Sequence, residues 1–97
     1  MIRHVALFRL KEDAPADARQ SLAIGLGELA ETISEIHTYR FGADLGLREG
    51  NFDFGVVADF ETESDFRTYV AHPRHQAFIS ERLTPVVADR VSLQFEF

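Results

Sequence analysis

Hydrophobic and polar residues alternate in four segments of the chain, and this period of two predicts four β-strands. The segments cover residues 2–10, 37–45, 52–60 and 91–97. In the first segment, one face carries Ile2, His4, Ala6, Phe8 and Leu10, and the other carries Val5 and Leu7. Both faces of this strand are therefore largely apolar, and we expect it to be covered on both sides.

Two helical regions separate these strands. In the first region, apolar residues recur at steps of four and three, which predicts an amphipathic helix after Pro15. Its apolar stripe is Leu22, Leu26, Leu29, Ile33 and Ile36. Gly25 and Gly27 weaken this helix, and we interpret them as marking a close contact with the sheet.

The second helical region is interrupted by a proline. Thr62 is a candidate N-cap with Asp65 at the capping-box position, and Pro73 starts further helical turns that continue to Leu83. The inward side chains are predicted to be Phe66, Tyr69, Val70, Phe78 and Ile79. The element order is therefore βαββαβ, an α+β fold in one domain covering residues 1–97.

Two helical regions can cover only one face of a four-stranded sheet. We expect the large apolar side chains of the first and third strands to occupy the face without helices; these are Phe8, Leu10, Phe52, Phe54 and Phe60. Soluble monomers rarely expose so large a patch, which predicts a homodimer with sheet packed against sheet. The alternative is that residues 85–90 and the termini fold over this face, but these segments are short and polar.

Composition narrows the function classes. The 97 residues carry a net charge of −6, and their basic residues form no cluster, which argues against a nucleic-acid partner. The absence of cysteine excludes disulfides and thiolate chemistry. The chain enters a strand pattern directly and contains no apolar run long enough to cross a membrane, so we expect a cytoplasmic protein without a membrane partner.

Histidine and tyrosine are the candidate chemical groups. Pro73 breaks the helix that carries Tyr69, so the chain can bend and bring His75 back toward Tyr69. His75 would suit proton transfer, since burial lowers its pKa and keeps it neutral. The structural alternative is that His75 caps the bend and Tyr69 packs in the core. His4 is a ligand contact or a hydrogen-bonded core residue.

Other polar residues carry less chemistry. His72 suits a helix start, and together with His75 it lacks the further ligands that a stable metal site requires, so no metal is predicted. The acids Asp44, Asp53, Asp59 and Glu96 are expected to face solvent, away from any cavity.

The strand that begins Arg3-His4-Val5 and the segment from Tyr69 to His75, with its His72-Pro73-Arg74-His75 box, resemble the Dabb family of stress-responsive dimeric α/β-barrel domains. The likeness runs along essentially the whole chain. It implies a ferredoxin-like protomer whose sheet packs on a second copy to form a barrel with a pocket in each half.

Within that family the chain is similar to a plant polyketide cyclase that performs an aldol condensation without a metal. The resemblance implies that His75 is the base, that Tyr69 orients it together with a substrate carbonyl, and that His4 contacts the substrate. The implied pocket residues are Ala6, Phe8, Tyr39, Phe54, Val56 and His72. The cyclase has a histidine where this chain has Phe54.

Three functions follow as hypotheses. The first is a homodimeric protein that binds a small, largely apolar or polyketide-like molecule in the barrel and has no assigned reaction. The second is a cofactor-free cyclase or lyase in which His75 is the general base. The third is a cofactor-independent monooxygenase, since such enzymes share this architecture.

Overall fold

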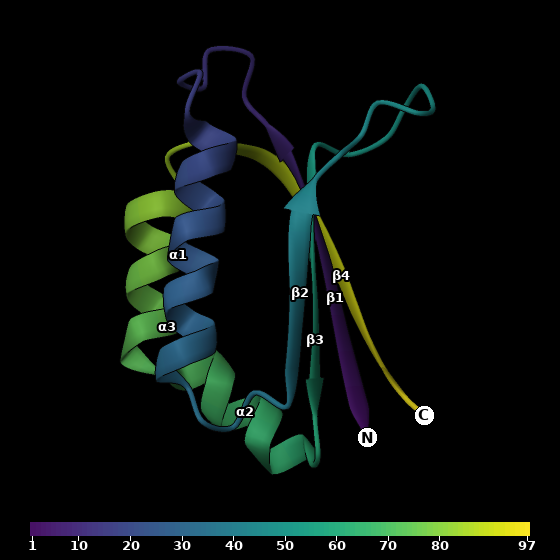
Figure 1. Ribbon diagram of the computed structural model, residues 1–97, viewed down its shortest axis with the longest axis vertical. Coiled ribbons are helices and arrows are strands. Elements are labelled where there is room, and N and C mark those ends of the chain that lie inside the picture. Colours follow the sequence, from purple (N-terminus) through teal and green to yellow (C-terminus); the bar gives the residue numbers. More distant parts are fainter.

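The four strands form one antiparallel sheet, and the helices cover one of its faces (Figure 1). The computed structural model describes residues 1–97. Its elements are β1 (Ile2–Leu10), α1 (Ala18–Thr32), β2 (Thr38–Ala43), β3 (Phe54–Phe60), α2 (Glu63–Ala71), α3 (Pro73–Phe78), the π-helical turn η1 (Ile79–Leu83) and β4 (Val87–Glu96). The strand order across the sheet is β2-β3-β1-β4. The βαββαβ order and the ferredoxin-like protomer predicted above are confirmed.

The second helical region follows the local signals in the sequence. The Thr62 hydroxyl accepts the backbone N–H of Asp65 at 3.0 Å, and this bond caps α2. Helix α2 ends at Ala71, and Pro73 occupies the first turn of α3. His72 connects the two helices, and its Nδ1 atom accepts the backbone N–H of Arg74 at 3.1 Å. The predicted helix-start role of His72 is therefore confirmed.

The first helix is shorter at its end than predicted, and Ile33 is its C-cap. A Cβ atom at Gly25 would lie 2.6 Å from the Phe78 ring, so glycine here lets α1 approach α3. The interpretation of close packing is thus right for Gly25, but its neighbour is a helix instead of the sheet. Gly27 faces open space.

The prediction that large aromatic side chains occupy the helix-free face is wrong. Phe8, Leu10, Phe54 and Phe60 lie in the buried core between the sheet and the helices, with Leu22, Leu26 and Leu29 of α1. Side chains alternate between the two faces along each strand, so these residues share the helix-covered face with Ala6, Val56 and Ala58. Phe52 precedes β3 and is half-buried, with the Arg9 guanidinium 4.2 Å from its ring centroid.

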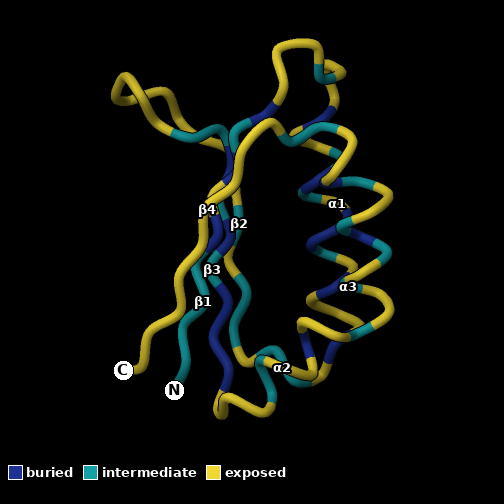
Figure 2. Tube along the Cα trace, turned by 180° about the vertical axis from the view of Figure 1, so that it is seen from behind, coloured by how far each residue is buried: buried dark blue, intermediate teal, exposed yellow.

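The helix-free face carries the odd-numbered residues of β1, β3 and β4 and the even-numbered residues of β2, and it is largely apolar on the first three of these strands. In register across β3, β1 and β4, Val57 pairs with Val5 and Val5 with Leu93, while Leu7 pairs with Val91. The side chains from β4 are exposed, with Leu93 56% accessible to solvent. Figure 2 shows β4 exposed along its length. We call the surface formed by Val5, Leu7, Val57, Val91, Leu93 and Phe95 the open face.

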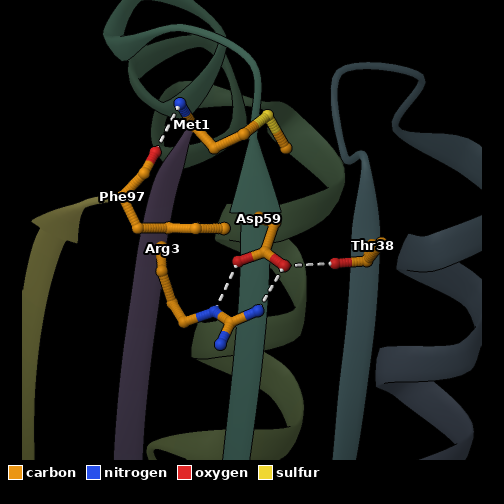
Figure 3. A network of polar contacts seen from close by, with 5 residues as sticks. All are labelled: Met1, Arg3, Thr38, Asp59 and Phe97. Carbon is orange, nitrogen blue, oxygen red and sulfur yellow. Dashed lines mark hydrogen bonds and ion pairs between the residues drawn. The ribbon is translucent and has the colours of Figure 1, made fainter.

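A polar network crosses the end of the open face near the chain termini (Figure 3). The Arg3 guanidinium donates to both Asp59 carboxylate oxygens at 2.8 and 2.9 Å, and the Thr38 hydroxyl donates to one of them at 2.6 Å. The expectation that Asp59 is solvated is wrong, because only 5% of the residue is exposed. Its position on β3, paired with Thr38 on one side and Arg3 on the other, supplies these donors.

The same donors set the ionisation of this carboxyl group. The hydrogen bond from Arg3 is the largest influence, and it lowers the pKa of Asp59 to about 2 against an opposing effect of burial. The Arg3 guanidinium also lies 4.8 Å from the centroid of the Phe97 ring. The network therefore links β2, β3 and β1 to the C-terminal residue.

Candidate functional site

The proline break brings Tyr69 and His75 together. Their ring centroids lie 4.2 Å apart with an interplanar angle of 34°, which confirms the predicted bend. Tyr69 points inward from α2 and is 2% exposed, whereas His75 lies in the first turn of α3. The Tyr69 ring thus forms one wall against which the imidazole is held.

A neighbouring carbonyl determines where His75 carries its proton. The Nδ1 atom lies 3.2 Å from the backbone oxygen of Val70. A carbonyl oxygen only accepts hydrogen bonds, so Nδ1 is the protonated nitrogen of the neutral ring. The lone pair of Nε2 is then free to accept a proton or a hydrogen bond from a ligand.

The opposite tautomer is favoured at His4. The Gln94 side-chain amide nitrogen lies 2.9 Å from His4 Nδ1, and an amide N–H only donates. Nδ1 therefore accepts, and Nε2 carries the proton of the neutral ring. His4 lies on β1 with its ring centroid 6.3 Å from that of Tyr69 and 5.3 Å from that of Phe66.

Partial burial favours the neutral form of both imidazoles. Desolvation is the largest influence on the pKa of His4 and lowers it, and the charge of His75 lowers it further. Desolvation also lowers the pKa of His75, reinforced by Arg90 and His72 and opposed by the hydrogen bond to Val70. A neutral imidazole is the form that a general base requires.

The Tyr69 hydroxyl is already bonded to another phenol. Its oxygen lies 2.7 Å from the Tyr39 hydroxyl oxygen, across from α2 to β2. Burial raises the pKa of Tyr69 to about 12 and raises that of Tyr39 further, so both remain protonated. When the Tyr39 hydroxyl donates to Tyr69, the proton of Tyr69 is available for a hydrogen bond to a ligand.

A cavity of about 240 Å³ connects these groups, and it lies between the sheet and the helices of one protomer. The sequence-predicted residues that line it are His4, Ala6, Phe8, Val56, Tyr69 and His75. Three other predicted pocket residues do not line the cavity. Phe54 packs in the core, and His72 caps α3. Tyr39 reaches the site only indirectly, through its hydrogen bond to the Tyr69 hydroxyl. His4 lies on the face of β1 that the helices cover, so the cavity that it lines is within one protomer and not between two sheets.

Several residues of the cavity wall were missed by the sequence reasoning. Helix α1 contributes Leu26, and the α3–η1 segment contributes Phe78, Ile79 and Leu83. Strand β4 contributes Arg90, Ser92 and, between them, Val91, whose side chain lies on the open face. The sequence predicts that Phe78 and Ile79 face inward, and this prediction is the only sequence signal for their place in the cavity wall. For Ser92 the signal is its alternation with Val91 on the last strand, whereas Arg90 precedes the predicted strand and has no local signal.

The chain contains no group of three or more histidine, aspartate or glutamate side chains close enough together to hold a metal ion. None of its helices has the length and apolar character needed to cross a membrane.

The sheet order, the helix layer and the histidine-lined cavity define a ferredoxin-like domain of the α/β-barrel type. The family described as the stress responsive A/B barrel domain matches residues 2–97, and the chain belongs to this family, Dabb. It is 24% identical over 95 residues to a stress-response A/B barrel domain-containing protein of Arabidopsis thaliana, an alignment that covers 98% of the chain. The chain spans only 36% of the length of that plant protein.

Solved structures share the same fold. A dimeric ferredoxin-like protein of unknown function from Thermobifida fusca is 45% identical, with a TM-score of 0.91 over 99% of this chain and 90% of that one. The hydroxynitrile lyase of Passiflora edulis is 22% identical, with a TM-score of 0.84 over 97% of this chain and 90% of the lyase. At that identity the lyase shows a common fold and no more.

Proposed function

We propose that the protein is a homodimer in which each protomer binds a small, largely apolar molecule in the cavity between its sheet and its helices. The observation that carries this proposal is the cavity itself, in which apolar walls surround two partly buried imidazoles. Binding sites for small molecules combine such walls with a few convergent polar groups.

The two imidazoles define the polar end of the ligand. His4 offers an N–H donor at Nε2, and His75 offers an acceptor at Nε2. A hydroxyl or an acidic C–H next to a carbonyl group satisfies both. The apolar body of such a ligand would lie against Ala6, Phe8 and Val56.

The homodimer is supported by the open face and by relatives. Apolar side chains from three strands lie on this face, and β4 leaves an unpaired edge. Exposed edges and apolar patches of this kind are normally covered. The structure at 45% identity is described as dimeric.

A cavity-filling substitution tests the binding site. We expect Ala6→Leu to occupy the cavity and weaken ligand binding by at least about tenfold, whereas Ala30→Leu on the exposed side of α1 leaves binding unchanged. Binding is measured by NMR titration with small ketones and hydroxyketones, followed through the imidazole signals of His4 and His75. Equal affinity in the wild type and Ala6→Leu would contradict the assignment of the cavity.

A cofactor-free lyase or cyclase is the second candidate, and the opposite tautomers of the two imidazoles favour it. His75 Nε2 would remove a proton from a ligand hydroxyl or from the carbon beside a carbonyl. His4 Nε2–H would stabilise the negative charge that develops on the carbonyl oxygen. The resemblance in fold to a hydroxynitrile lyase is consistent with this chemistry.

Turnover of cyanohydrins and of β-polyketone analogues tests the second candidate. We expect His75→Ala to abolish any turnover while the dimer persists, because the imidazole is the only base at that position of the cavity. His37→Ala, at a half-exposed residue before β2, is the matched control. An active His75→Ala protein would rule out His75 as the base.

A further inference from the structure

The cavity contains one cation and no acid. Its charged or polar wall residues are Arg90, His4, His75, Tyr69 and Ser92, and every other wall residue is apolar. This composition contrasts with the chain as a whole, which carries 16 acidic residues and a net charge of −6. The absence of carboxylates from this one surface makes it the part of the molecule best suited to a negative group.

Arg90 is held at the cavity without an acidic partner. The ion pairs of the chain involve Arg3, Arg19, Arg67 and His37, and Arg90 takes part in none of them. Arg90 pairs with Phe8 in the β1–β4 register, so its side chain lies on the helix side of the sheet. Its neighbour Asp89 is directed to the other face for the same reason.

Arg90 and the His75 imidazole line the same cavity. Although burial is the main influence on His75, the positive charge of Arg90 lowers the pKa of His75 further. Arg90 is exposed on the edge strand and lines the cavity, so we take it to mark the side on which the cavity opens to solvent. Ser92, two residues along the same face of β4, adds a hydroxyl to the wall.

We propose that Arg90 binds the carboxylate of a small carboxylic acid whose apolar body fills the cavity. This inference rests on the proposed binding function and specifies its ligand class. A guanidinium accommodates a carboxylate through two parallel hydrogen bonds. At the mouth the carboxylate stays partly hydrated, so its desolvation penalty is smaller than that of a fully buried anion.

The body of such an acid reaches the imidazoles from the mouth. Apolar carbons next to the carboxylate would pass Ser92 and lie against Ala6, Phe8 and Val56. An oxygen further along the ligand would then meet His4 Nε2–H and His75 Nε2. Arg90 thus determines which end of the ligand faces solvent and which end faces the histidines.

Matched acids and amides test the proposal. Benzoate is compared with benzamide, and hexanoate with hexanamide, by NMR titration of the wild-type protein. We expect each acid to bind at least about tenfold more tightly than its amide. Arg90→Gln should remove this preference and leave the affinity for the amides unchanged.

A second arginine variant controls for net charge. Arg74→Gln makes the same charge change on α3, in a different surface hollow that contains Glu28 and Glu81. It should keep the preference for acids. The ligand-free proteins give an independent measurement, because the pKa of His75 should rise in Arg90→Gln and change less in Arg74→Gln.

The outcomes separate the two proposals. If acids and amides bind the cavity equally, or if Arg90→Gln keeps the preference, the carboxylate site is overturned and the binding function stands. If acids, amides and the ketones used to test the cavity all leave the signals of the cavity residues unshifted, the binding function fails and the carboxylate site fails with it.

Discussion

At the scale of single residues, the two cavity histidines differ because their neighbours differ. Val70 offers His75 a carbonyl oxygen, and Gln94 offers His4 an amide N–H. Each contact fixes one ring nitrogen and leaves Nε2 for the cavity, as an acceptor on His75 and as a donor on His4. Two copies of the same residue type therefore provide complementary groups, and partial burial favours the uncharged form of both.

Asp59 is the residue whose ionisation matters most for folding at acid pH. Its pKa is lowered from 3.8 to about 2 in the folded protein, mainly by the hydrogen bond from Arg3. Its contribution is complete above pH 3.8 and disappears as the pH falls toward about 2. We expect Asp59→Asn to be less stable than the wild type at neutral pH and to lose less stability across this window.

Urea unfolding of both proteins at a series of acidic pH values measures this effect. Asp13→Asn is the control, because Asp13 is exposed in the turn after β1 and makes no side-chain hydrogen bond or ion pair. A wild-type protein and Asp59→Asn variant with parallel pH profiles would contradict the role given to the Arg3–Asp59 pair.

At the scale of elements, the junction of α2 and α3 was predictable because its signals are local. Thr62 caps one helix, His72 caps the next, and Pro73 prevents the two from merging. The stacking of Tyr69 on His75 follows from this bend. Each of these features depends on residues fewer than eight positions apart, so the sequence contains the information needed to predict it.

The faces of the sheet were harder to assign. Alternation correctly separates Phe8 and Leu10 from Val5 and Leu7, but both sets are apolar, and periodicity alone does not tell which set the helices cover. The larger side chains lie under the helices, where Leu22 and Leu26 pack on them. The smaller valines and leucines, together with β4, form the open face.

Arg90 was missed for a related reason. Its place in the cavity depends on the pairing of β4 with β1, in which Arg90 meets Phe8, and on the register shift next to it between Arg9 and Leu10. Contacts between residues 82 positions apart leave no local pattern in the sequence. The buried environment of Asp59 escaped prediction in the same way, since it depends on Arg3 and Thr38 from two other strands.

At the scale of the whole molecule, the β2–β3 loop extends from the sheet on the side opposite the helices, which is the side of the open face. Both views of the chain show the β2–β3 loop extending from this side at one end of the sheet (Figures 1 and 2). Its Leu45 and Leu47 are 83% and 80% exposed. Within the loop, Asp44 accepts hydrogen bonds from the Gly46 backbone N–H and the Asn51 side-chain amide. A loop with two exposed leucines beside an apolar face is suited to contact a second copy.

The dimer prediction can be tested on the β4 side of the open face. Leu93→Glu would place a charge on each side of a two-fold interface, so one substitution disrupts two equivalent contacts. We expect it to weaken dimerisation by at least about a hundredfold, and Leu45→Ser with Leu47→Ser to weaken it less. Ile24→Glu, at a half-exposed residue on α1, should leave the dimer intact. Sedimentation velocity distinguishes the 11.0 kDa protomer from its dimer, and a wild-type protein that sediments as the protomer at micromolar concentration would contradict the homodimer.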